Sequence, residues 1–209
     1  MIAIIDYKIG NIGSLVNVFD YLDEEVRVIS DPSLIKDYTA IVLPGVGAYD
    51  TALTALEQTG FIEPIKEYVI SGKPALGICL GMQLFCNKSE EGIKKGLGLI
   101  DGDIRSLKNL GCTGKIPHVG FNEITNVDGD SSFYTDIKGN DFYFVHSYAL
   151  SKLKDSSEDV SLGYSEYEGV KFISTLKQGN IFASQFHPEK SSSAGLKFIR
   201  SFLKCLKKD

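Results

Sequence analysis

Residues 73–85 hold the feature that most constrains the fold, an apolar run that reaches Cys79 and is followed by a helical pattern. Gly77 and Gly81 flank this cysteine at the spacing of a nucleophile elbow, a sharp strand-to-helix turn where larger side chains would collide with neighbouring backbone. A thiol at a helix N-terminus lies in the positive end of the helix dipole, which favours the thiolate. A buried structural cysteine is the alternative, because free cysteine is among the most buried residue types. This stretch alone leaves both interpretations open.

Short apolar runs alternate with helical patterns in the first half of the chain. The runs that predict buried strands cover residues 1–6, 26–29, 38–43 and 74–78, and the helical patterns cover residues 14–21, 49–58 and 62–70. Ser14 is the predicted cap of the first helix. Such alternation predicts an α/β fold with a central, mostly parallel sheet flanked by helices, in which functional loops gather at the carboxyl ends of the strands.

The pattern changes after residue 96, where apolar runs are separated by turn residues instead of helices. These runs, at residues 97–100, 103–107, 142–145, 169–173 and 180–184, predict antiparallel strands added to the core. The serine-rich and charged segment 152–159 predicts an exposed loop. Apolar residues at helical spacing over 196–206 predict a C-terminal helix.

Composition narrows the range of functions. With 209 residues and 43% hydrophobic residues, the chain suits one globular domain spanning residues 1–209. The net charge of -5 argues against nucleic-acid binding driven by phosphate neutralisation. No apolar run approaches the roughly 18 residues of a membrane span, so we expect a cytoplasmic protein. The four cysteines lack CxxC spacing, and we expect no disulfide framework, metal site or cofactor.

A cysteine nucleophile needs a base, and the base usually needs an acceptor that orients it. His187 follows the predicted strand 180–184, and Glu189 lies two residues further on, so both side chains can point to the same side. The alternative is a surface histidine beside a solvated carboxylate. His118 and His146 lack adjacent acids and are better interpreted as structural or gate-lining residues.

Acyl transfer through a thiolate also requires hydrogen-bond donors for the developing oxyanion. Gly45, Val46 and Gly47 form a loop after the predicted strand 38–43, and their backbone is the best candidate. In elbow enzymes the residue after the nucleophile supplies a second N–H group, which here is Leu80. The alternative is that this loop is only a tight turn.

Taken together, these motifs resemble those of the class I (triad) glutamine amidotransferases along nearly the whole chain. The resemblance rests on Gly-Ile-Cys-Leu-Gly-Met-Gln at 77–83 and His-Pro-Glu at 187–189. A narrower resemblance, to the glutaminase subunits of imidazole glycerol phosphate synthase, rests on residues 6–7, 10–11, 44–48, 115–118, 143–148 and 185–191. It implies the single-domain fold of that family.

The resemblance also implies roles for individual residues. Cys79 would be the nucleophile, His187 the general acid and base, and Glu189 its orienter. Gln83 would bind glutamine, and the segment from Gly45 to Gly47 would present the oxyanion hole. The residues implied at the partner face or the gate are Lys190, Tyr143, His146, Phe121 and Asn11.

The partner implied by the resemblance is a (β/α)8-barrel cyclase subunit that receives ammonia released from glutamine. The family usually carries glycine at position 8 and tryptophan within segment 118–122, where this chain has Lys8 and Phe121. Related glutaminase subunits serve a barrel-like partner in bacterial surface-sugar biosynthesis, which is the first alternative. An independent Cys-His hydrolase and a catalytically silent binding subunit are the others.

Overall fold

A computed structural model describes residues 1–129, 132–154 and 159–207. Its centre is a set of parallel strands in the order β2-β1-β3-β4-β13. Their bounds are Ile2–Ile5 for β1, Val26–Ile29 for β2, Ala40–Leu43 for β3, Ala75–Ile78 for β4 and Ile181–Ser184 for β13. All four residues of β1, β3, β4 and β13 are buried, as expected where helices cover both faces of a parallel sheet.

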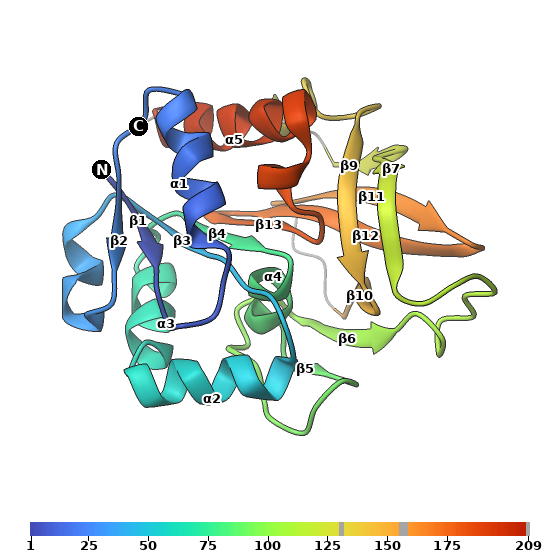
Figure 1. The fold of residues 1–209 in the computed structure, drawn as a ribbon, viewed down its shortest axis with the longest axis horizontal. Coiled ribbons are helices and arrows are strands. Elements are labelled where there is room, and N and C mark those ends of the chain that lie inside the picture. Colours follow the sequence, from blue (N-terminus) through green and yellow to red (C-terminus); the bar gives the residue numbers. More distant parts are fainter. Residues whose placement is uncertain (130–131, 155–158, 208–209) are drawn as a thin grey trace.

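Helices lie on both sides of these strands (Figure 1). The α-helices are α1 (Ile12–Tyr21), α2 (Tyr49–Thr59), α3 (Ile62–Ile70), α4 (Leu80–Phe85) and α5 (Ser192–Leu206), and the 3-10 helices are η1 (Pro32–Asp37), η2 (Ser132–Tyr134) and η3 (Pro188–Lys190). Ala3 and Ile5 of β1 join a core with α2 and α3, whereas Ile2 and Ile4 join a second core with α1 and α5. The alternation of β1 side chains thus divides the interior into two layers.

The second half of the chain extends the sheet with antiparallel strands. They are β12 (Val170–Gln178), β10 (Tyr148–Leu153) and β6 (Gly102–Ser106), with short β5 (Lys88–Ser89) parallel to β6 at the end. Strand β12 also pairs with β11 (Val160–Tyr167), which pairs with β8 (Asn126–Asp128). A separate antiparallel pair is formed by β7 (His118–Glu123) and β9 (Asp141–His146), and Figure 1 shows it at one side of the main sheet.

The predicted fold class is confirmed, with one strand in an unexpected role. Segment 180–184 was expected among the added antiparallel strands, but β13 runs parallel to β4 and antiparallel to β12. It is therefore the junction between the two halves of the sheet. Both β4 and β13 point their carboxyl ends the same way, so the segments that follow them, with Cys79 and His187, meet at one edge.

Three local predictions were wrong in whole or in part. Residues 97–100 form no strand, because their N–H groups bond to the end of α4: Leu97 donates to Leu84 and Ile100 donates to Phe85. Their apolar character reflects burial under that helix. Helix α1 begins before Ser14, with Asn11 at the N-cap. Strand β10 reaches into the predicted loop 152–159, of which residues 155–158 lie outside the described ranges.

Candidate active site

Cys79 lies at the turn between β4 and α4 with a backbone φ of 54° and ψ of -108°. A positive φ is uncommon for a residue with a side chain, and it persists where surrounding structure holds it. Here the Cys79 N–H donates to the Ser184 carbonyl on β13 at 2.7 Å. A Cβ atom on Gly81 would overlap the Leu43 carbonyl, and one on Gly77 would lie 2.9 Å from Gly81 backbone. The two glycines therefore allow the close packing predicted for a nucleophile elbow.

His187 follows β13 and forms a buried pair with Glu189. The distance between His187 Nδ1 and Glu189 Oε1 is 2.8 Å, and both side chains are almost completely buried. Burial alone would lower the pKa of His187, but the neighbouring Cys79 and Glu189 outweigh it and raise this pKa to about 10. Among the described residues, the buried Nε2 atom of His187 has no hydrogen-bond partner. This nitrogen is therefore available for proton transfer at the Cys79 side.

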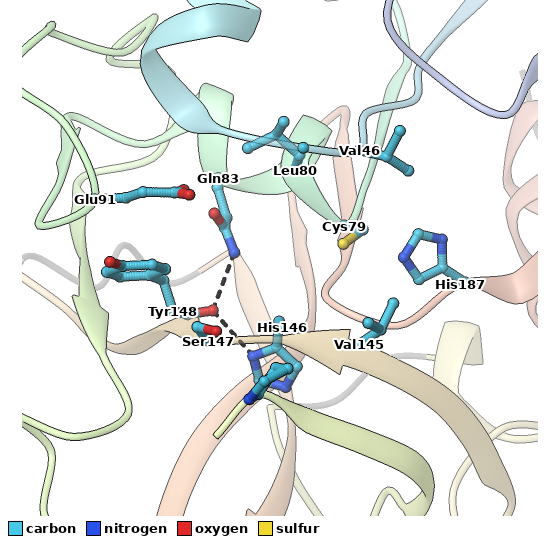
Figure 2. Close-up of a pocket in the computed structure, with 12 residues that line it drawn as sticks. Val46, Cys79, Leu80, Gln83, Glu91, Val145, His146, Ser147, Tyr148 and His187 are labelled. Atoms are coloured by element: carbon cyan, nitrogen blue, oxygen red, sulfur yellow. Dashed lines mark hydrogen bonds between the residues drawn. The ribbon is translucent and has the colours of Figure 1, made fainter. Parts of the chain in front are cut away.

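Cys79 and His187 border a cavity of about 300 Å³. Figure 2 shows His187 beside Cys79 at one end of it, with Gln83, Glu91 and Tyr148 toward the other. The full lining consists of Val46, Gly47, Cys79, Leu80, Gln83, Glu91, Pro117, Val145, His146, Ser147, Tyr148 and His187. Six sequence-predicted site residues from three separate segments thus meet in one pocket, together with the gate candidate His146 from a fourth.

The Gln83 amide has a fixed orientation in this pocket. Its Nε2 atom donates to the Tyr148 carbonyl at 3.0 Å and to Gln185 Oε1 at 3.0 Å. A carbonyl oxygen can only accept, so the amide nitrogen must face Tyr148. Both N–H groups of Gln83 are thereby used within the protein, and its oxygen is left for a ligand.

The loop from Gly45 to Gly47 packs against the elbow at Leu80 and Gly81, and Val46 and Gly47 line the pocket there. Tyr7 fixes its start, because the phenol donates to the Pro44 carbonyl at 2.8 Å. A Cβ atom on Gly45 would lie 2.8 Å from the Tyr7 hydroxyl and 2.9 Å from Leu80 Cβ, so this glycine permits the close approach to α4. Gly47 has a φ of 93°, which glycine adopts without strain.

The predicted partner-face and gate residues lie in three places. Phe121 and Tyr143 meet with ring centroids 5.5 Å apart, and Lys190 Nζ lies 5.6 Å from the Tyr143 ring centroid. Phe121 is 59% exposed, so this cluster faces outward. His146 is buried beneath it and lines the pocket. Asn11 is exposed at the N-cap of α1, away from these ring contacts.

His118 and His146 form a directed hydrogen-bond chain. His146 Nδ1 lies 3.0 Å from the Tyr148 carbonyl and must donate to it, which leaves Nε2 to accept from His118 Nδ1 at 3.1 Å. Burial lowers the pKa of His118 to about 4 and that of His146 to about 3. Both rings are therefore neutral at physiological pH, and their role as structural or gate-lining residues stays a prediction.

Comparison with known proteins places this geometry in a family. Residues 3–205 match the family described as "Glutamine amidotransferase class-I". The chain belongs to the class I glutamine amidotransferases. A solved structure titled "Crystal structure of glutamine amidotransferase" has a TM-score of 0.73 at 16% identity, with 98% of each chain covered. The "Structure of PurLQS from Thermotoga maritima" has a TM-score of 0.72 at 21% identity, covering 99% of this chain and 98% of that one.

Curated relatives are similar over nearly their whole length. "Imidazole glycerol phosphate synthase subunit HisH" of Caldanaerobacter subterraneus subsp. tengcongensis is 42% identical, covering 99% of this chain and all of the relative. "Imidazole glycerol phosphate synthase subunit HisH 1" of Legionella pneumophila (strain Lens) is 40% identical, covering 97% and 98%.

Glu91 and Tyr148 line the pocket of this glutamine amidotransferase, and Gln185 contacts Gln83 and Cys79, but none of the three was identified from the sequence as a site residue. The carboxylate of Glu91 accepts from the Tyr49 N–H at 3.3 Å, and burial raises its pKa. Asp50 holds the same loop to α2 by accepting from the Ile93 N–H at 3.0 Å. Glu91 sits in a polar run without a distinguishing pattern, so only the tertiary structure reveals its position.

Within residues 1–129, 132–154 and 159–207, none of the helices is both long and apolar enough to cross a bilayer. Within the same ranges, no three His, Cys, Asp or Glu side chains are grouped in a way that would hold a metal ion.

Proposed function

We propose that this chain is the glutaminase subunit of a cytoplasmic imidazole glycerol phosphate synthase, with residues 1–209 acting as one glutamine amidotransferase domain. It hydrolyses glutamine and passes the ammonia to a (β/α)8-barrel subunit, which forms imidazole glycerol phosphate and aminoimidazole carboxamide ribotide in histidine biosynthesis. The observation that carries the chemistry is Cys79 on a strained elbow beside the His187–Glu189 pair. The curated relatives support the assignment to this enzyme, because they are named as subunits of imidazole glycerol phosphate synthase.

The chemistry begins with attack of the Cys79 thiolate on the side-chain amide carbon of glutamine. His187 protonates the departing nitrogen, the C–N bond breaks, and ammonia leaves a γ-glutamyl thioester on Cys79. The neutral imidazole then takes a proton from water, whose oxygen attacks the thioester and releases glutamate and the thiolate. Glu189 holds His187 Nδ1 at 2.8 Å, so Nε2 carries the proton in both steps.

Glutamine would be oriented by groups at the far end of the pocket. The Gln83 oxygen, left unused by the hydrogen bonds of its nitrogen, can accept from the substrate. The carboxylate of Glu91 lines the same pocket and complements an α-ammonium group. The backbone at Gly45, Val46 and Gly47, with the Leu80 N–H, is positioned near the developing oxyanion.

The partner would dock over the outward face of β7 and β9. Val119, Phe121 and Val145 expose 55%, 59% and 37% of their surfaces there, which is unusual for large apolar side chains on adjacent strands. Lys190 and Tyr143 extend this surface toward η3. A partner docked there would lie close to the gate residue His146 and to the loop from Gly45 to Gly47. If this loop turns its N–H groups toward the substrate only in the complex, partner binding activates the glutaminase. Asn11, exposed at the N-cap of α1 and outside the β7–β9 face, is proposed as a separate contact for the partner.

Reconstitution with the barrel subunit tests this function. Replacing Cys79 with serine should abolish glutamine-dependent synthesis and leave synthesis from added ammonium intact, since the barrel performs the second reaction. Cys112→Ser is the matched control, because Cys112 is a partly exposed free cysteine outside the pocket. Loss of both activities in Cys79→Ser would contradict the division of labour. Amination of a sugar acceptor instead would assign the chain to the surface-sugar alternative.

A further inference from the structure

Gln185 occupies an unusual position for a side-chain amide. It follows β13 directly, two residues before His187, and its side chain is fully buried. An amide has two donor hydrogens and an acceptor oxygen, so complete burial is costly unless these groups find partners. The partners of Gln185 decide what it can do.

Both ends of the Gln185 amide contact the proposed active site. Its oxygen accepts from Gln83 Nε2 at 3.0 Å, and its nitrogen donates to Cys79 Sγ at 3.8 Å, a normal distance for sulfur. Gln185 therefore bridges the sulfur of the nucleophile and the side chain at the substrate end of the pocket.

The direction of this bridge follows from chemistry. The Tyr148 carbonyl accepts from His146 Nδ1 and from Gln83 Nε2, so Gln83 must turn its nitrogen toward Tyr148 and Gln185. Gln185 must then present oxygen to Gln83, which leaves its N–H aimed at Cys79. Through Gln83, the backbone carbonyl of Tyr148 thus orients the Gln185 amide so that its N–H donates to the Cys79 sulfur.

We propose that Gln185 is a positioning residue that holds the Cys79 thiolate with its amide N–H and fixes the Gln83 amide in its substrate-binding orientation. This inference rests on the proposed glutaminase function. A donor aimed at sulfur favours the thiolate over the thiol, because hydrogen bonds to a charged acceptor are stronger than those to a neutral one. The titratable groups that face Cys79 are His187 on the β13–η3 turn and Tyr7 after β1.

The test is the pH dependence of Cys79 alkylation by iodoacetamide, followed by mass spectrometry of the peptide that contains Cys79. Gln185→Met removes the donor and the acceptor at similar length. Gln185→Glu keeps an acceptor for Gln83 and removes the donor toward sulfur. We expect both changes to raise the midpoint of the alkylation rate against pH by about one pH unit or more. At a pH below the midpoints of wild type and variant, the variant should then be alkylated about tenfold more slowly. Gln58→Glu, at an exposed position on α2, is the charge-matched control and should leave the midpoint unchanged.

The outcomes separate this inference from the proposed function. If wild-type Cys79 titrates like an ordinary thiol, near pH 8.5, the activated nucleophile itself is absent. If the wild-type midpoint is low and stays low in a folded Gln185→Met or Gln185→Glu protein, the positioning role is overturned. A lower melting temperature with an unshifted midpoint would mark Gln185 as a packing residue and also overturns it. In the complex, the KM for glutamine should rise in Gln185→Met, because Gln83 loses one of its two hydrogen-bond anchors and keeps only the Tyr148 carbonyl.

Discussion

The backbone N–H of His187 donates to the Tyr143 carbonyl at 2.9 Å, which ties the proposed base to the strand beneath the proposed partner surface. Ser191 reinforces this link. Its hydroxyl donates to the His187 carbonyl at 2.6 Å and accepts from the Tyr143 N–H at 2.9 Å. Any displacement of β9 is therefore transmitted directly to the backbone of His187.

Replacing Ser191 with alanine should loosen this connection. The change leaves the Tyr143 N–H without its partner and removes one of the two donors to the His187 carbonyl, which also accepts from the Lys190 N–H at 3.0 Å. We expect the free energy of unfolding to fall by about 1–3 kcal/mol. Urea unfolding measures the loss. Ser193→Ala is the control, because Ser193 is exposed in the first turn of α5 and should change stability by less than about 0.5 kcal/mol. Equal stabilities of the two variants would show that Ser191 does not support this link.

Two glycine-to-alanine changes, at Gly81 in the elbow and at Gly13 in α1, should change the stability of the protein in opposite directions. On Gly81 a Cβ atom would overlap the Leu43 carbonyl, so Gly81→Ala should destabilise the protein by about 3 kcal/mol or more and reduce glutaminase activity. On Gly13 of α1 a Cβ atom meets nothing within 4 Å. Gly13→Ala should therefore stabilise the protein by about 0.5–1 kcal/mol, since alanine has the higher helix propensity. Thermal unfolding checks both signs, and a stable Gly81→Ala protein would contradict the close packing at the elbow.

The sequence predicts candidate site residues from short motifs but not the contacts between the segments that carry them. Cys79 and Gln83 belong to one such motif, and His187 and Glu189 to another. Gln185 lies in one of those motifs, yet its bonds to Gln83 and Cys79 depend on how β13 sits beside β4. Hydrogen bonds between distant segments are set by strand order and register, which no local pattern encodes.

The same limit explains the strand and loop errors. Segment 180–184 has the composition of any buried strand, so its parallel partner β4 could not be identified from the run itself. Residues 97–100 are apolar because they pack beneath the end of α4, a tertiary cause that resembles a strand in sequence. The alternation of strands and helices in the first half was strong enough to predict the fold class correctly.

Glu189→Gln should lower the pKa of His187. The carboxylate is one of the two neighbours that raise this pKa to about 10, so its neutralisation removes part of the stabilisation of the imidazolium. NMR titration of the ring protons measures the change. The other two histidines titrate far lower, near 4 and 3, and do not interfere. Glu25→Gln, on an exposed side chain, should leave the titration unchanged. An unaltered His187 pKa in Glu189→Gln would contradict the pairing.

The buried His118–His146 pair should make the protein sensitive to acid. Their folded pKa values lie below the unfolded value of about 6.5, so the unfolded chain binds protons that the folded chain does not. Stability from these groups is complete above about pH 6.5 and is lost as the pH falls toward 4 and 3. His118→Asn keeps a donor for His146 without a titrating ring. Between pH 7.5 and 5.0, the midpoint urea concentration of unfolding should decrease less in this variant than in the wild type. An equal decrease would contradict the claim that the His118–His146 pair makes the protein sensitive to acid.

Phe121→Asp should weaken the complex with the barrel subunit while leaving this chain folded. Phe121 is 59% exposed and contacts Tyr143 in the outward cluster, so a charge there costs little in the free chain but would be buried in the proposed complex. Aromatic anchors of this kind contribute about 2 kcal/mol or more to association, which corresponds to about a thirtyfold increase in Kd. Titration calorimetry with the barrel subunit measures this. Ile70→Asp is the control, because Ile70 is 77% exposed at the end of α3 and outside the β7–β9 face. Equal weakening by both variants, or by neither, would place the partner surface elsewhere.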